Sequence, residues 1–286
     1  MDNSIVATFS LVARDEATGH LGVAVASKFL AVGSVVPTAV AGVGAFASQA
    51  RANTTFGDRA MAALAAGRSA EDVISEFRAT DDMFEQRQFG LVLPDGRSFS
   101  HTGSECLDWA GGVTGEGFAA QGNILAGPQV VDALVDTWKS SRAPFPERML
   151  EALLAADEAG GDSRGRQSAA IYVAGEGMGY GGLTDRWIDL RVDDHEQPIP
   201  ELQRLLGLYR LILGRAQGEP LKLGKEEIGW LQQRLGVEVT GSWNDATEAQ
   251  LQALFSRENL EDRWLGGPLV DVAAWRHVSR VLEGEN

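Results

Sequence analysis

The sequence has little of what would place it in several common classes of protein. Its single cysteine, Cys106, excludes an internal disulfide and fits a reducing compartment. No apolar stretch approaches the roughly 20 residues that a membrane-spanning helix needs. The opening residues MDNSIVA lack the basic start and long apolar segment of a secretion signal. These absences predict a cytoplasmic protein without a membrane partner.

Positive charge and histidine are also scarce. The chain has 25 Lys and Arg against 40 Asp and Glu, a net charge of -15, and it has no basic run, so a nucleic-acid partner is not expected. Asp193-Asp194-His195 resembles a metal-ligand cluster only superficially, because neighbouring residues of a strand point to opposite faces. The sequence therefore predicts neither a metal nor a cofactor.

Small apolar residues dominate the first fifty positions. Thr8–Ala13 and Leu21–Ala26 are strand-length runs joined by a polar turn, and a third run, from about Val35 to Ala47, consists almost wholly of Val, Ala, Gly and Phe. Such strands are not suited to face water on either side. They predict a place in the middle of a stack of layers.

Strands and helices alternate in groups along the next part of the chain. The patterns predict helices over about 59–66, 69–78, 128–138, 145–156 and 199–214, and strands over about 87–93, 97–101, 117–123, 168–174 and 186–192. Two antiparallel sheets packed face to face, with helices outside each, satisfy this order. The predicted fold class is α+β, a four-layer αββα sandwich.

A change in composition marks a linker near Gln217-Gly218-Glu219-Pro220. Beyond it, Lys225–Leu235 and Asn244–Phe255 are amphipathic at helical spacing, and a further helix is expected over Val270–Leu282. The sequence thus predicts a sandwich domain over residues 1–216 and a small all-α domain over residues 217–286.

Thr8 is the first candidate for chemistry. A threonine that opens a chain can act as a nucleophile, because its own α-amine takes the hydroxyl proton. This role requires that residues 1–7 be removed. Lys28, if it lies beside that hydroxyl, would lower its pKa or stabilise developing negative charge. The alternative is that Thr8 is a β-branched strand residue selected for packing.

The loop before the strand at 168–174 is the second candidate. Its sequence, GDSRGRQS, contains Asp162, Arg166 and Ser168. Glycines with a carboxylate, hydroxyls and arginines could orient a nucleophile or bind a substrate carboxylate. Such composition is also typical of a solvated loop between a helix and a strand.

Amide side chains at strand ends form the third candidate. Gln49 and Asn123 are predicted to bind substrate, because amides can donate to an oxyanion or to a substrate carbonyl. Asn53 and Gln121 stand in similar positions. All four could equally cap exposed backbone. Cys106 has no histidine at a spacing that argues for partnership, so a buried or incidental thiol is expected there.

Several separated motifs carry a resemblance to a known family. They are TFSLVARD, GVAVASKFLAVGSVVP, HTGSECLDWAG, QGNILAG, GGDSRGRQSAA and DLRVDDH, between about Thr8 and Tyr209. The sequence resembles the bacterial and archaeal family called domain of unknown function 1028. The resemblance implies an N-terminal-nucleophile-hydrolase-like fold, whose members cleave amide bonds with a terminal Thr, Ser or Cys. It implies Thr8 as nucleophile, Lys28 as its activator, and Asp162 with Ser168 as supporting residues.

The segment LQQRLGVEVTGSWNDATEAQLQALF is similar to peptidoglycan-binding-like helical modules. A docking or dimer-forming role fits this segment at least as well as glycan binding, since no secretion signal is present.

The sequence leads to two functional hypotheses. The first is an N-terminal-nucleophile hydrolase that acts on a small amide or peptide, with no cofactor. The alternative is a non-catalytic binding or assembly protein on the same fold. The small strand residues and acidic composition are compatible with a homo-oligomer.

Overall fold

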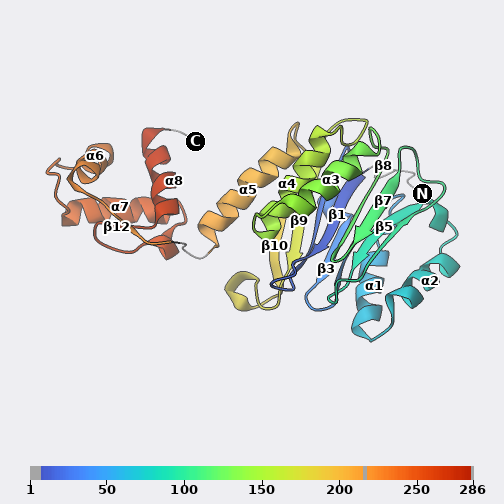
Figure 1. The fold of residues 1–286 in the computed structure, drawn as a ribbon. Helices are drawn as coiled ribbons and strands as arrows, with labels where there is room; N and C mark the ends of the chain where they lie inside the picture. Colours follow the sequence, from blue (N-terminus) through green and yellow to red (C-terminus); the bar gives the residue numbers. More distant parts are fainter. Residues whose placement is uncertain (1–7, 215–217, 285–286) are drawn as a thin grey trace. The chain divides into compact units, whose positions relative to one another are not determined.

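The computed structural model describes residues 8–214 and 218–284. Its internal contacts divide the chain into two compact units, Met1–Leu206 and Gly207–Asn286. The predicted boundary between residues 216 and 217 lies outside the described residues. A mixed α+β composition with antiparallel sheets is confirmed (Figure 1).

The first unit contains a six-stranded antiparallel sheet with strand order β10-β9-β2-β1-β8-β7. The strands are β1 (Thr8–Arg14), β2 (Leu21–Ser27), β7 (Gly111–Gly115), β8 (Phe118–Asn123), β9 (Ser168–Ala174) and β10 (Arg186–Val192). Strand β7 was not predicted, because GGVTG has neither the β-branched content nor the alternation of a typical strand.

A second sheet has the order β3-β4-β5-β6. Its strands are β3 (Pro37–Val40), β4 (Gly44–Ala50), β5 (Arg87–Val92) and β6 (Ser98–Thr102). The expectation of one continuous run from Val35 to Ala47 was wrong, since this stretch is a tight β3–β4 hairpin. Gly42, with a φ of 69°, occupies the left-handed conformation that the turn requires and that glycine adopts without steric cost.

The two sheets pack face to face. Val12, Val23 and Val25 of the large sheet share one hydrophobic cluster with Ala45 and Val92 of the small sheet. Side chains alternate across a strand, so residues of the opposite parity face the helices. The small apolar residues predicted for the middle of a layered stack therefore lie there.

Helices cover the outer face of each sheet (Figure 1). Helices α3 (Gln129–Ser140) and α4 (Phe145–Glu158) pack on the large sheet. Helices α1 (Phe56–Ala65) and α2 (Ala70–Thr80) cover the small sheet, where Phe56 and Phe77 join Phe46 and Phe89 in one core. The Ser69 hydroxyl caps α2 by accepting a hydrogen bond from the Asp72 backbone N–H, as its capping pattern predicts.

The second unit is built mainly from helices. Helix α5 (Pro198–Ile212) runs across the division between the units, and it is followed by α6 (Lys225–Leu235), α7 (Asp245–Arg257) and α8 (Val272–Glu283). Leu231, Leu251 and Val278 lie at its centre. Two-residue strands β11 (Leu221–Lys222) and β12 (Leu269–Val270) pair beside the helices, and they are too short to be recognised from sequence.

Candidate functional site

One row of polar side chains crosses the large sheet at the amino end of β1. In the strand register, Thr8 pairs with Asn123 on one side and with Ser27 on the other, and Ser27 pairs with Ser168. Directly paired residues point to the same face of a sheet. All four side chains are at most 2% exposed, and Thr8 Oγ1 lies 3.3 Å from Ser27 Oγ. The register thus brings together Thr8, Asn123 and Ser168 from three predicted sites.

A set of buried amides fills the space between the sheets beside this row. We call Ser10, Gln49, Gln88, Gln121 and Asn123 the amide cluster; each is 0% exposed. The Ser10 hydroxyl donates to Gln49 Oε1 over 2.6 Å and accepts from Gln121 Nε2 over 2.7 Å. Gln49 Nε2 and Asn123 Nδ2 both donate to Gln88 Oε1, over 2.8 and 2.9 Å. Hydrogen bonds therefore link the two sheets at this end.

Main-chain carbonyls fix the direction of every bond in the amide cluster. Gln88 Nε2 lies 2.7 Å from the carbonyl oxygen of Gly122, which can only accept, so this end of the Gln88 amide must be the donor. Gln88 Oε1 then accepts from Gln49 and Asn123, and the order continues through Ser10 to Gln121. Two acceptors remain at the ends of the network. Gln121 Oε1 and Asn123 Oδ1 are buried without a hydrogen-bond partner.

Buried polar atoms without a partner are rare and costly in folded proteins. Turning either amide over would place an oxygen against Gln88 Oε1 or would break the donation to Ser10. The orientation of the amide cluster therefore makes these unpartnered oxygens unavoidable, and Asn123 Oδ1 belongs to the cross-strand neighbour of Thr8.

Lys28 follows directly after β2 and is exposed. Its ammonium donates to the carbonyl oxygen of Arg166 over 3.0 Å, and its backbone N–H donates to Asp162 Oδ2 over 2.8 Å. Among the described contacts, the structure brings Lys28 to the loop before β9 and not to the hydroxyl of Thr8. Its role as activator stays a prediction.

Asp162 and Ser168 hold loops in place. The Asp162 carboxylate is buried and forms an ion pair with Arg164 over 2.9 Å, in addition to its bond with the Lys28 backbone. The Ser168 hydroxyl donates to the Phe29 carbonyl and accepts from the Val32 backbone N–H. Both residues thereby fix the segment that follows β2, next to the row that contains Thr8. This geometry is compatible with the supporting role predicted for them.

Arg166 lies at the edge of two open clefts of about 370 and 450 Å³. Its guanidinium donates to both oxygens of Asp157, and this hydrogen bonding raises the pKa of Arg166 above its ordinary value. Half of its side chain is exposed. Gln49 and Asn123, the other predicted substrate-binding residues, are inside the amide cluster and are fully buried.

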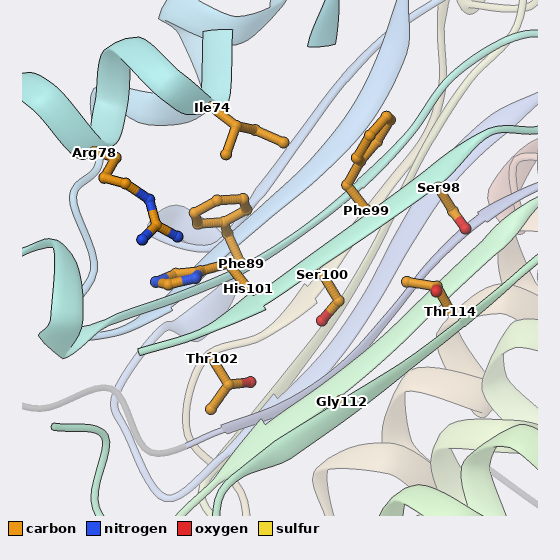
Figure 2. Close-up of a pocket in the computed structure, with 10 residues that line it drawn as sticks. All are labelled: Ile74, Arg78, Phe89, Ser98, Phe99, Ser100, His101, Thr102, Gly112 and Thr114. Carbon is orange, nitrogen blue, oxygen red and sulfur yellow. The ribbon is translucent and has the colours of Figure 1, made fainter. Parts of the chain in front are cut away.

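A larger cleft of about 550 Å³ runs along the edge of β6. Figure 2 shows Ser100, Thr102 and Thr114 on one side of the strand edge, and Ile74, Arg78 and His101 on the other. Thr102 Oγ1 also accepts a hydrogen bond from Gln88 Nε2 over 2.9 Å. The cleft therefore borders the amide cluster. Burial lowers the pKa of His101, whose ring packs on Phe84, so burial disfavours the charged imidazolium there.

Gln88 was not selected from the sequence, although it is the centre of the amide cluster. The alternation of side chains along a strand could have identified Gln88. Gln88, Gly90 and Val92 share one face of β5, and Val92 belongs to the core between the sheets. Ser27 was not selected from the sequence either, because its pairing with Thr8 depends on the register of two strands.

The surroundings of Cys106 bear on the reactivity of its thiol. Burial raises the pKa of the Cys106 thiol to about 11, which disfavours the reactive thiolate. Residues 8–214 and 218–284 contain no group of three His, Cys, Asp or Glu arranged to hold a metal ion. No helix in these ranges has both the length and the apolar character that crossing a membrane requires.

Comparisons with known proteins give a family but no activity. A family model described as "Family of unknown function (DUF1028)" matches residues 8–202. The crystal structure of protein SPO2555 from Silicibacter pomeroyi, which is described by the same family, is similar at 32% identity with a TM-score of 0.65; the match covers 71% of this chain and 89% of that chain. None of the curated proteins that were compared matches the sequence.

Proposed function

This chain belongs to the DUF1028 family, and from that premise we propose that it is an amide-bond hydrolase whose nucleophile is the hydroxyl of Thr8. The carrying observation is the position of Thr8. It is the first residue of β1 and of the matched family segment, and its side chain lies among the hydroxyl and amide groups between the sheets. This is the arrangement expected of an N-terminal-nucleophile hydrolase.

Cleavage of the Ala7–Thr8 peptide bond would supply the missing base. The new α-amine of Thr8 has a pKa near neutrality, and it takes the proton from Oγ1 as Oγ1 attacks the carbonyl carbon of a substrate amide. The C–N bond then breaks, the leaving amine takes that proton, and the acyl group remains on Thr8 as an ester. Water hydrolyses the ester with the α-amine again acting as base.

Amide N–H groups beside Thr8 are suited to stabilise the negative charge of the tetrahedral intermediate. Asn123 Nδ2 has one hydrogen bond to Gln88 and a second N–H to offer, whereas Gln49 Nε2 already donates to Gln88 Oε1 and to the Thr8 carbonyl oxygen and would have to exchange a partner. Loss of one such donor typically lowers kcat by about 10²–10³-fold in other hydrolases. We assign the substrate class as a small amide or peptide.

Mass spectrometry of the full-length chain after expression tests the proposal. The expected result is loss of residues 1–7 and a mature chain that begins at Thr8. Thr8→Ala should abolish turnover of N-acyl amides and dipeptide anilides, and Thr8→Ser should retain part of that turnover. Thr80→Ala, at an exposed helix position, is the control and should leave turnover unchanged. Active protein that retains Met1, or full activity in Thr8→Ala, would overturn the proposal.

A binding or assembly protein is the second candidate, and one observation favours it. Thr8 and the amide cluster are buried, so they also serve as an inter-sheet clamp that needs no substrate. In this case the helical unit, with its peptidoglycan-binding-like sequence, would provide the docking or dimer-forming surface. An unprocessed chain in which Thr8→Ala and Lys28→Ala leave ligand binding unchanged would favour this function.

A further inference from the structure

The proposed chemistry does not yet explain why the side-chain oxygen of Asn123 is buried without a hydrogen-bond donor. The Nδ2 atom of this residue has a fixed partner, Gln88 Oε1 at 2.9 Å, while its Oδ1 atom is buried without one. The donation from Gln88 to the Gly122 carbonyl prevents the network from reversing. Asn123 Oδ1 is thus held in place as an acceptor that lacks a donor.

The neighbour of this acceptor is Thr8. The two residues are a direct cross-strand pair of β1 and β8, and the Cβ atoms of such pairs lie about 4.5–5.5 Å apart on one face. Gln121 offers the natural contrast, because it occupies the same face of β8 two residues earlier and also has an unpartnered oxygen. It pairs with Ser10 and not with Thr8. Of the two orphaned acceptors, only Asn123 Oδ1 adjoins the amino end of β1.

We infer that Asn123 is a positioning residue, whose Oδ1 accepts a hydrogen bond from the α-ammonium of Thr8 in the mature chain. The inference rests on the proposed function, since that amine exists only after cleavage. The bond would direct the amine's lone pair toward Oγ1 when the proton is lost. It would also favour the protonated amine, because a hydrogen bond to the charged form stabilises it.

The test measures the α-amine itself, so it does not depend on an identified substrate. Mature protein is labelled with acetic anhydride across a pH series, and acetylation of the Thr8 peptide is quantified by mass spectrometry. Asn123→Leu should lower the pKa of the Thr8 amine by about one unit, because the acceptor is lost. Gln121→Leu, the matched control, should leave it unchanged. Asn123→Asp should raise it, since a carboxylate favours the ammonium form.

The opposite shifts of the Leu and Asp variants distinguish positioning from a general loss of stability, and either variant alone decides the matter if the other fails to fold. An unshifted amine pKa in the folded Asn123 variants, or an equal shift in Gln121→Leu, would overturn the inference while leaving Thr8 as nucleophile. A wild-type chain that keeps residues 1–7 would overturn the proposed function as well.

Discussion

The two units of the chain each contain a buried polar centre, and the two centres are completed differently. In the helical unit, Gln232 uses both ends of its amide. Its Nε2 donates to Thr240, Thr247 and the Ser242 carbonyl, and its Oε1 accepts from the backbone of Thr240 and Gly241. In the sandwich, the amide cluster leaves Gln121 Oε1 and Asn123 Oδ1 unpartnered.

This difference separates a structural polar centre from a candidate functional one. A buried amide whose hydrogen bonds are all made fixes one geometry and offers nothing to a ligand. A buried oxygen without a donor lowers stability, and its persistence needs an explanation such as a catalytic role. Gln232 therefore explains the turn between α6 and α7, whereas the amide cluster leaves an unpartnered oxygen on Asn123, the cross-strand neighbour of Thr8, where we propose chemistry.

The largest effect is expected where a buried charge loses its partner. Arg263 and Asp271 form an ion pair at 3.1 Å with both side chains at most 4% exposed, and Asp271 also caps α8. Asp271→Ala should lower the free energy of unfolding of the helical unit by about 3–5 kcal/mol, because the Arg263 charge stays buried and unpaired. Urea unfolding followed by tryptophan fluorescence measures this. Asp245→Ala, an exposed position in α7, is the control; equal losses would contradict the prediction.

A smaller loss is expected at the satisfied amide. Gln232→Leu leaves the backbone N–H groups of Thr240 and Gly241 without their acceptor, which should lower the free energy of unfolding by about 2–3 kcal/mol. The neighbouring Gln233 is exposed, so Gln233→Leu should change it by less than about 0.5 kcal/mol. If the two variants are equally stable in urea, Gln232 is not the centre of this unit.

Within the sandwich, substitutions at different positions of the amide cluster should lower the free energy of unfolding by different amounts. Gln88→Leu removes the acceptor of two amides and the donor to Gly122, so a loss of about 2 kcal/mol is expected. Gln121→Leu removes a donated bond to the Ser10 hydroxyl and a long one to the Ser10 carbonyl, together with an oxygen that has no partner, and about 1 kcal/mol is expected. Chemical unfolding of both variants measures the difference. A greater loss at Gln121 would show that its oxygen has a partner in solution.

The smallest effect is a pH dependence confined to the sandwich. Burial lowers the pKa of His101 in the folded state, so the unfolded chain binds the proton more readily. Stability from the neutral ring is fully present above the unfolded pKa, near 6.5, and is lost as pH falls below it through the lowered folded pKa. His101→Gln should reduce the change in thermal midpoint between pH 7.5 and 5.5. His195→Gln, at an exposed position, is the control; equal reductions would exclude His101 as the source.

Much of the sandwich could be predicted because its signals are local. The apolar runs at Thr8 and Leu21, the capping serine before α2 and the helical spacing in α3 each depend on residues close together in sequence. The hairpin at Gly42 was missed because Val, Ala and Gly on both sides of the turn look alike. Strand β7 was missed because glycine carries no strand pattern.

The candidate site was harder to predict. Thr8 could be selected because it opens an apolar run, Ser168 because it belongs to a polar loop before a strand, and Gln49 and Asn123 because they are amides at strand ends. Their pairing could not, because it depends on the register of four strands and on the packing of one sheet on another. Lys28 shows why a position near the site in sequence is not enough to predict a contact. It lies one residue beyond Ser27, and neighbouring residues of a strand point to opposite faces, so its ammonium contacts the Arg166 carbonyl.

By itself, the sequence determined the layered arrangement of strands and helices and the set of candidate functional residues, because apolar periodicity and the chemistry of each side chain depend only on the sequence. Only the tertiary structure decided which amides meet, which atoms of them donate, and that Asn123 Oδ1 is left as an acceptor beside Thr8. The physical reason is that the hydrogen bonds of the amide cluster between the two sheets join residues 23 to 72 positions apart, and no local pattern encodes their direction.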